Sequence, residues 1–148
     1  MKVKMYIKEA LVFGVLFVVI SSAVSIYRTS QMQIGDAVCQ KRSGIVYFWA
    51  TWCPVCKMTS PNVSRISEEF VVLGIAVRSG EREKVQAYMQ EHDLHFANRN
   101  DFDGTTAAGY GVNVFPTIVF CKNGHVKMAE VGYMSTLGLW LRAWLFTS

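Results

Sequence analysis

Two cysteines separated by two residues directly follow an unbroken apolar run, and this feature constrains the fold more than any other. The run Ile45–Ala50 is rich in β-branched and aromatic residues, which is typical of a strand covered on both faces. Cys53 and Cys56 come next, and Pro54 suits the first turn of a helix, where its missing N–H costs no hydrogen bond. The sequence therefore predicts a buried strand that leads directly into a helix carrying the cysteine pair.

Further strands and helices alternate along the chain. We expect the helix from Pro54 to extend to about Phe70, a second buried strand at Val71–Val77 and a helix at Glu81–His92 with acids in its first turn. Asn123–Gly124 is a strong hairpin signal. The remaining elements before the last helix are a short helix from Asp103 to Tyr110 and strands at Thr117–Cys121 and Val126–Val131.

The last helix is expected after Ser135 or Thr136, either of which can cap it. Its apolar stripe consists of Leu137, Leu141, Trp144 and Leu145. We expect this helix, with Trp140 and Trp144, to pack onto the domain, although an aromatic helix close to a bilayer could also touch it. Together the elements predict an α/β fold with a mixed sheet flanked by helices on both faces.

The composition fits one folded domain with an additional segment. The chain has 148 residues, of which 51% are hydrophobic and 18% charged, so the main state is not disordered. The formal net charge of +4 is concentrated in the first 28 residues, because the remainder carries 11 basic and 10 acidic side chains. A basic surface for nucleic acid is therefore not predicted.

Residues 1–28 read as a membrane anchor. The 17 residues Ala10–Ile26 contain no charge, which is the lower limit for a spanning helix, and three lysines precede them while Arg28 follows. This bias places the N-terminus in the cytoplasm and the rest of the chain across the membrane. A cleaved signal peptide is the alternative. Residues 29–44 are then a linker and lead-in, and 45–148 the folded domain.

The cysteine pair has the asymmetry that thiol–disulfide exchange requires. Cys53 is expected at the helix N-terminus, where free N–H groups and the helix dipole favour the thiolate. Cys56 lies one turn later and is more covered, so its pKa is expected to be higher. An exposed Cys53 thiolate would attack a disulfide, and Cys56 would resolve the mixed disulfide.

Three other uses of a cysteine pair are possible. A structural zinc site needs four ligands, and the chain has no second C-x-x-C motif, so no metal site is predicted. A purely structural disulfide over so short a loop removes little chain entropy. Copper(I) remains an alternative, because thiolates are soft ligands and Met58 is close in sequence.

The segment Phe48–Lys57, the later Val114–Thr117 and the Asn123–Gly124 turn resemble the thioredoxin superfamily. Within it, the W-C-P-x-C form, the N-terminal anchor and Glu130–Tyr133 resemble the membrane-anchored, periplasm-facing TlpA-like branch, especially the suppressor-of-copper-sensitivity D type. The resemblance implies a thioredoxin fold, a redox-active Cys53–Cys56 pair and no cofactor.

The resemblance also implies a cis peptide bond at Phe115–Pro116, beside the cysteines. A proline in a strand-like run belongs at a strand start or edge, because it cannot donate to the ladder. In the family this loop pairs with a substrate segment. The residues expected to contact substrate are Trp52, Pro54, Val55, Phe115, Pro116 and Thr117.

Three positions depart from relatives in the superfamily. Tyr47 stands where cytosolic thioredoxins have a buried aspartate, which questions proton transfer by that route. Thr117 follows the loop proline, where cytochrome c maturation reductases have an acidic residue. Pro54–Val55 lacks the histidine that stabilises the thiolate in strong oxidants, which favours a reductant or an electron relay.

Cys39 and Cys121 flank strands that are antiparallel neighbours in the thioredoxin fold. They would lie at the end of the sheet opposite Cys53, where a Cys39–Cys121 disulfide could close a long loop. Two separate thiols are the alternative, with Cys121 buried and Cys39 exposed.

The sequence thus predicts a single-pass protein of the bacterial inner membrane, with its oxidoreductase domain in the periplasm. Protein thiols and disulfides are the expected substrates, and a membrane thiol reductase of the DsbD kind is the expected electron donor, by resemblance. The alternatives are a cytochrome c maturation thiol reductase and a Cu(I)-binding copper-tolerance module.

Overall fold

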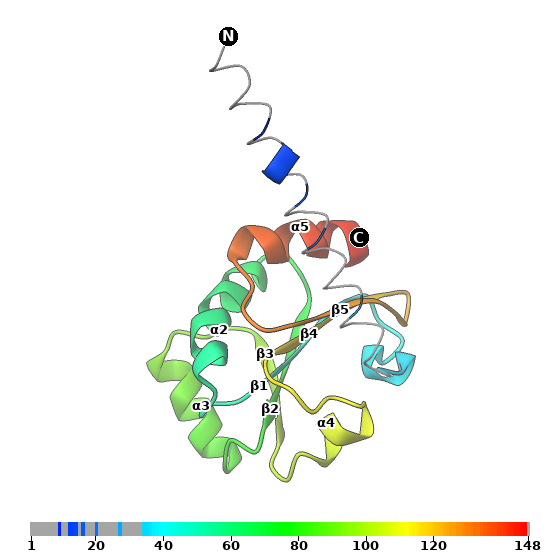
Figure 1. Cartoon of the computed structure of the whole chain (residues 1–148). Helices are drawn as coiled ribbons and strands as arrows, with labels where there is room; N and C mark the ends of the chain where they lie inside the picture. The colour runs from blue at the N-terminus through cyan, green and yellow to red at the C-terminus, as the bar shows by residue number, and fades with distance from the viewer. Residues whose placement is uncertain are drawn as a thin grey trace. The chain divides into compact units, whose positions relative to one another are not determined.

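The computed structural model describes residues 34–147 and positions 9, 12–14, 16, 20 and 27 of the N-terminal segment (Figure 1). The chain divides into two compact units, Met1–Met32 and Gln33–Ser148. Among the described residues, no helix combines the length and hydropathy that a membrane span requires. The anchor predicted at 10–26 lies largely outside the described residues.

The folded unit contains the mixed sheet that the sequence predicts. The five strands are β1 (Gly44–Trp49), β2 (Val72–Val77), β3 (Ala97–Asp101), β4 (Thr117–Lys122) and β5 (His125–Val131). Their order in the sheet is β3-β2-β1-β4-β5. β1 and β3 both pair with β2 in parallel, and β4 pairs with β1 and β5 antiparallel.

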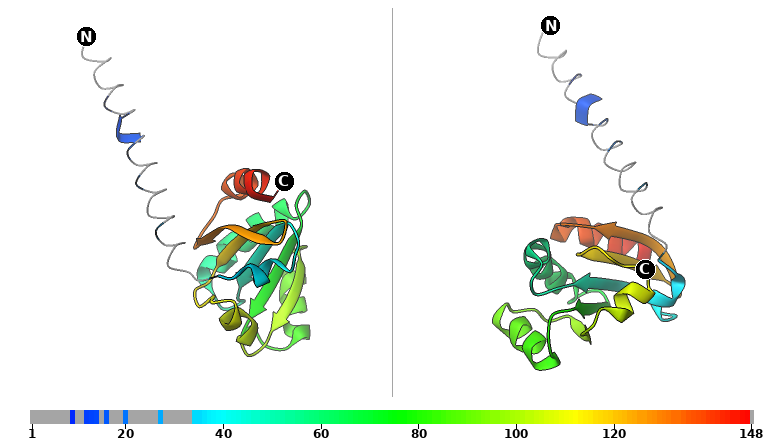
Figure 2. Two further views of the ribbon diagram at one scale, coloured as in Figure 1. Left: turned by 90° about the vertical axis from the view of Figure 1, so that its right-hand side faces the viewer. Right: turned by 60° about the horizontal axis from the view of Figure 1, so that its bottom comes forward.

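Helices cover both faces of this sheet (Figure 2). The helices are the 3₁₀ turn η1 (Asp36–Cys39), α2 (Pro54–Ile66), α3 (Arg82–Glu91), α4 (Thr105–Gly109) and α5 (Thr136–Thr147). Successive residues of β1 alternate between the faces. Tyr47 and Trp49 pack in the core under α2, α3 and α5, whereas Val46 and Phe48 pack in the core under η1 and α4. The fully buried β1 therefore lies at the centre of the fold.

One helix ends earlier than expected, and one strand was not predicted. α2 ends at Ile66 rather than near Phe70, because the following residues form turns in which Ser67 Oγ donates to the Ser64 carbonyl at 2.6 Å. β3 was not predicted, because its sequence Ala-Asn-Arg-Asn-Asp lacks the side chains typical of strands. It forms an edge strand through backbone pairing with β2, from Leu73 and Ala97 to Val77 and Asp101.

The last helix packs onto the domain as expected, but not through Trp144 or the apolar stripe. Leu137, Leu141, Trp144 and Leu145 are 74%, 48%, 56% and 50% exposed. The helix instead buries Leu139 and Ala143 completely, and the small alanine lets it lie close to the sheet and α2. The stripe with the larger side chains therefore faces away from the core.

Candidate active site

Cys53 is the N-cap residue of α2. Its backbone is extended, with φ −85° and ψ 117°, and its sulfur accepts a hydrogen bond from the Cys56 N–H at 3.2 Å. The preceding loop is held by Ser79, whose hydroxyl accepts the Thr51 N–H at 3.1 Å. The N–H contact and the positive end of the helix dipole both favour negative charge on the Cys53 sulfur.

Cys53 and Cys56 form a disulfide with a Cα–Cα distance of 5.2 Å. Cys53 is 5% exposed and Cys56 is 1% exposed, so the attacking residue is less open than expected from the sequence. The Phe115 carbonyl oxygen lies 3.6 Å from the Cys53 sulfur and contributes to this cover. Cys56 is nevertheless the more enclosed of the two, as the spacing predicts.

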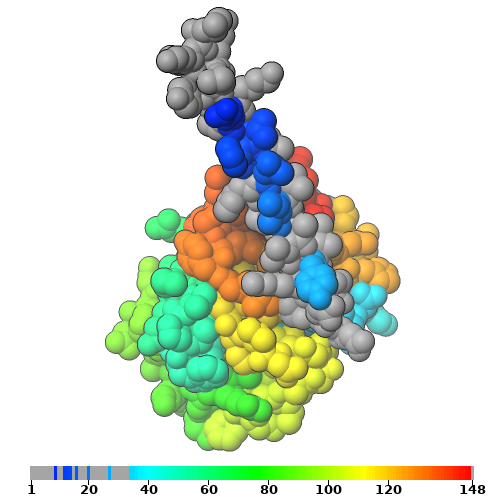
Figure 3. Space-filling view, in the orientation of Figure 1, coloured from blue at the N-terminus to red at the C-terminus, as the bar shows by residue number. Residues whose placement is uncertain are grey.

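The segment before β4 brings the predicted loop to Cys53. The Phe115–Pro116 peptide bond is cis, as the resemblance implies. Thr117 is fully buried at the start of β4, opposite Phe48 of β1, and its hydroxyl donates to the Val114 carbonyl at 2.7 Å. Figure 3 shows the start of α2, in teal, beside the yellow region that includes α4 and the segment leading to β4.

Aromatic side chains flank the disulfide. Trp52 is 56% exposed, and its indole N–H donates to the Arg78 carbonyl at 2.9 Å. Its ring meets that of Phe115 edge to face, with 6.1 Å between centroids. Pro54 is exposed, Val55 and Phe115 are half-buried, and Pro116 and Thr117 are buried beneath them. This surface can hold an extended apolar peptide against the sulfur.

A pair of buried hydroxyls lies beside Cys56. The Tyr47 and Ser60 hydroxyls are 2.9 Å apart, and Tyr47 also donates to the Cys56 carbonyl at 3.5 Å. Burial raises the pKa of Tyr47 well above its ordinary value, so the phenol stays protonated. Ser60 was not predicted, although its position four residues after Cys56 places it on the same face of α2.

Two further supports escaped the sequence analysis, namely the Ser79 hydroxyl and the Arg78 carbonyl that hold the loop and Trp52. Both belong to the segment after β2, and only tertiary folding brings them here. In the described part of the chain, no group of three His, Cys, Asp or Glu side chains gathers in a way that could hold a metal ion. Met58, considered as a copper ligand, is 58% exposed.

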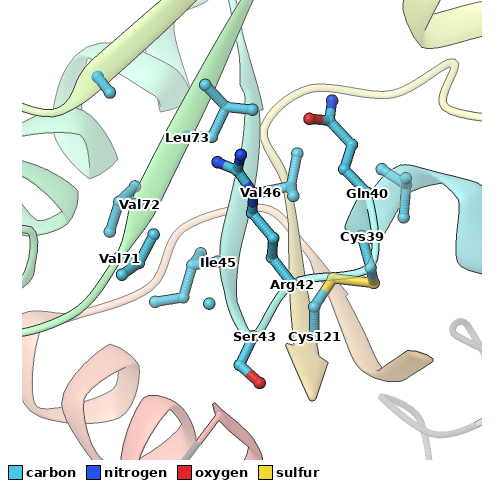
Figure 4. A pocket seen from close by; sticks show the side chains of 13 residues that line it. Cys39, Gln40, Arg42, Ser43, Ile45, Val46, Val71, Val72, Leu73 and Cys121 are labelled. Atoms are coloured by element: carbon cyan, nitrogen blue, oxygen red, sulfur yellow. A yellow bond between two sulfur atoms is a disulfide. The ribbon is translucent and has the colours of Figure 1, made fainter. Parts of the chain in front are cut away.

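Cys39 and Cys121 form a second disulfide at the other end of the sheet. They are 82 positions apart in sequence, their Cα atoms are 5.6 Å apart, and they are 3% and 2% exposed. Figure 4 shows this bond at the edge of a cavity that also takes in Arg42, Ile45 and Leu73. The cavity has a volume of about 140 Å³.

The comparisons with known proteins agree with this geometry. The thioredoxin family model matches residues 26–140. A thioredoxin-like protein of Haemophilus influenzae is 32% identical, over 96% of this chain and 95% of its own length. The thiol:disulfide interchange protein DsbE of Pseudomonas aeruginosa is 28% identical, over 68% of this chain and 57% of its own length.

A solved structure extends the likeness. A secreted disulfide oxidoreductase of Mycobacterium tuberculosis, described as homologous to E. coli DsbE, superposes with a TM-score of 0.63 at 26% identity. The match covers 72% of this chain and 85% of that one. The chain belongs to the thioredoxin family, and its fold and cysteine pair are those of a thiol–disulfide oxidoreductase.

Proposed function

We propose that this protein is a membrane-tethered, periplasm-facing thiol–disulfide oxidoreductase that reduces disulfides in protein substrates or relays electrons to them. The observation that carries the proposal is the position of Cys53, which caps α2 and lies 3.6 Å from the carbonyl of the cis-proline loop. The nucleophile and a peptide-binding edge are thereby adjacent.

The exchange proceeds through two sulfur–sulfur substitutions. The Cys53 thiolate attacks one sulfur of a substrate disulfide, a new intermolecular disulfide forms, and the other substrate sulfur leaves as a thiolate. The Cys56 thiolate then attacks the Cys53 sulfur and releases the second substrate thiolate. The substrate gains two electrons and takes up two protons, while Cys53 and Cys56 are oxidised to the disulfide seen in the structure.

The hydroxyl pair beside Cys56 affects the second substitution. Cys56 must lose its proton to attack, yet it is 1% exposed. The raised pKa of Tyr47 means that this phenol is a hydrogen-bond donor rather than a base at neutral pH. Tyr47 and Ser60 therefore position the Cys56 turn and polarise its surroundings, and the Cys56 proton leaves to substrate or solvent.

Reduction is favoured over oxidation by the residues between the cysteines. Pro54 and Val55 provide no cation to stabilise the Cys53 thiolate, whereas a histidine there would stabilise the reduced form and make the protein a stronger oxidant. A dithiol donor must then reduce Cys53–Cys56 after each cycle. A membrane thiol reductase of the DsbD kind fits this role for a tethered protein.

The tether is supported by the uncharged run 10–26 between lysines and Arg28. The described positions Phe13, Leu16 and Ile20 of this run are helical, and their side chains are 71%, 48% and 59% exposed. Tethering raises the effective concentration of the domain toward membrane partners.

The test is the redox equilibrium of the full chain against glutathione, followed by thiol trapping, with Cys53→Ser as the control. We expect a potential near the thioredoxin value of about −270 mV, whereas a value near −120 mV would indicate an oxidant. Protease accessibility in spheroplasts tests the location of the domain. Stoichiometric Cu(I) retention without disulfide reduction would instead indicate a copper-binding module.

A further inference from the structure

One face of α5 is apolar and exposed. We name it the α5 outer face, and its members are Leu137, Trp140, Leu141, Trp144 and Leu145. Their exposed fractions lie between 38% for Trp140 and 74% for Leu137. An exposed group of large apolar side chains on one helix face indicates an interaction surface.

The fold holds α5 mainly through its inner side, and Trp140 of the outer face adds one hydrogen bond to Glu69 at 2.9 Å. Leu139 and Ala143 on the inner side are fully buried. The turn before the helix is fixed by Asn62 of α2, whose amide donates to the Met134 carbonyl at 3.0 Å and whose amide oxygen accepts the Thr136 hydroxyl at 2.9 Å. The α5 outer face is therefore presented on a rigid element.

We propose that the α5 outer face is a membrane-interface surface that lies in the headgroup region of the bilayer. Leucine and tryptophan on one side of a helix are the combination that interfacial helices use, and tryptophan favours the boundary between acyl chains and headgroups. α5 contains no acidic residue, and its one cation, Arg142, faces Glu130 at 3.4 Å rather than the solvent side.

A bilayer is favoured over a second protein because of the tether. This step rests on the membrane anchor proposed above. Residues 27–33 separate the uncharged run from Ile34, and seven residues reach at most about 25 Å. A domain of this size has a radius of gyration of about 13 Å, so a linker of this length holds the domain close to the bilayer.

Membrane contact through this face leaves the cysteines in water. α5 begins beside Asn62, and Trp140 donates to Glu69 at 2.9 Å, so α5 runs along α2 away from its first residues. Cys53 lies at the opposite end of α2, about 13 Å before Asn62 along the helix axis. The bilayer would thus fix the orientation of the domain while Cys53 remains open to partners near the membrane.

The experiment uses the full oxidised chain, in which all four cysteines are in disulfides, so that one added cysteine can be labelled. Leu141→Cys carries the dye NBD in the α5 outer face, and Ala108→Cys on exposed α4 is the matched control. Both proteins are mixed with vesicles of phosphatidylcholine and phosphatidylglycerol, with and without brominated acyl chains.

We expect a blue-shifted NBD emission at 141 that loses about half its intensity to brominated lipid, and an unchanged aqueous emission at 108. An aqueous emission at 141 would overturn the proposal. A blue shift that grows with protein concentration and ignores brominated lipid would also overturn it, by assigning the face to a second copy.

Carbonate extraction separates this proposal from the tether. If the chain resists extraction while the dye at position 141 stays in water, the membrane anchor is supported and the proposal for the α5 outer face is wrong. If the chain is extracted, but brominated lipid quenches the dye at position 141 before extraction, the α5 outer face is supported and the membrane anchor is wrong. A second variant is Leu141→Gln/Trp144→Gln, and intact thiol–disulfide exchange would show that its domain is folded. In this variant we expect that vesicles no longer protect the α5 backbone from hydrogen exchange.

Discussion

The two disulfides of this protein are chemically the same bond in opposite surroundings. Cys53–Cys56 spans three positions at a helix start and lies beside a cis-proline loop and an exposed Trp52. Cys39–Cys121 spans 82 positions and is enclosed between η1 and β4, with both residues at most 3% exposed. Both bonds are buried in the core, but the first lies beneath a surface that can hold a peptide and the second lies under η1 at the other end of the sheet.

The difference shows that local exposure alone does not separate a reactive disulfide from a structural one. Cys53 is only 5% exposed, close to the 3% of Cys39. What differs is the N–H that Cys56 directs at the Cys53 sulfur, which favours a thiolate, and the proline loop beside it, which can hold a peptide. Cys39 lies in a short 3₁₀ turn, which provides no comparable set of donors.

Loss of Cys53 should have the largest effect. Cys53→Ser replaces the thiolate with a hydroxyl that does not attack disulfides at neutral pH, so reduction of insulin should fall to the rate of the reagent blank. The insulin turbidity assay with dithiothreitol measures this rate. Activity retained at half the wild-type rate or more would mean that Cys53 is not the nucleophile.

Removing the Cys39–Cys121 disulfide should lower stability but leave activity largely unchanged. Cys39→Ser/Cys121→Ser opens a long loop in the unfolded chain and should lower the free energy of unfolding by about 4 kcal/mol, against about 2 kcal/mol for the short loop of Cys53–Cys56. Urea unfolding measures the difference. Under native conditions, insulin reduction by the double variant should stay within about twofold of wild type, and a large loss would make this pair part of the redox site.

Tyr47→Phe tests the polar contact that distinguishes the surroundings of Cys56. The substitution leaves the buried Ser60 hydroxyl without its partner at 2.9 Å, so we expect a loss of about 1 to 2 kcal/mol in urea. Burial keeps Tyr47 protonated, so Tyr47 does not itself titrate near neutral pH. A difference in the pH dependence of activity between Tyr47→Phe and wild type would therefore come from a change in the pKa of the thiols. Ser60→Ala breaks the same hydrogen bond from the other side, so a comparable loss is expected, and no loss in either variant would contradict the role of this contact.

The smallest expected effect lies near Cys39. The Val126 N–H, followed by His125, holds the pKa of Asp36 below its usual range, and these contacts join η1 to β5. A lowered carboxyl pKa stabilises the fold above the unfolded pKa and loses this contribution as pH falls through the folded pKa. Urea unfolding should therefore show a steeper loss of stability below about pH 4 in wild type than in Asp36→Asn. Equal slopes would contradict the role of Asp36.

Local patterns predicted the centre of the fold. The apolar run of β1, the proline at the start of α2 and the Asn123–Gly124 turn each determine the backbone around them, and the structure confirms all three. The cysteine positions follow from the same segment. These features depend on neighbouring residues, which is why sequence alone was sufficient.

Features that depend on distant partners were not predicted correctly. β3 forms because β2 offers an unpaired edge, and its own polar residues carry no signal for a strand. The side of α5 that packs was misjudged because close approach at Ala143 outweighs burial of the larger Leu141 and Trp144. Ser79 and the Arg78 carbonyl reach the site from 28 and 26 positions away.

The Cys39–Cys121 bond also determines how mechanical force passes through the domain. A force on the segment before Cys39 is transmitted through the disulfide to Cys121 in β4, without passing along the chain through β1 and α2. β4 runs from Cys121 back to Thr117, next to Pro116, over about 14 Å. Tension between the N-terminal segment and a peptide held at the proline loop is therefore carried mainly along β4, the strand that pairs with β1.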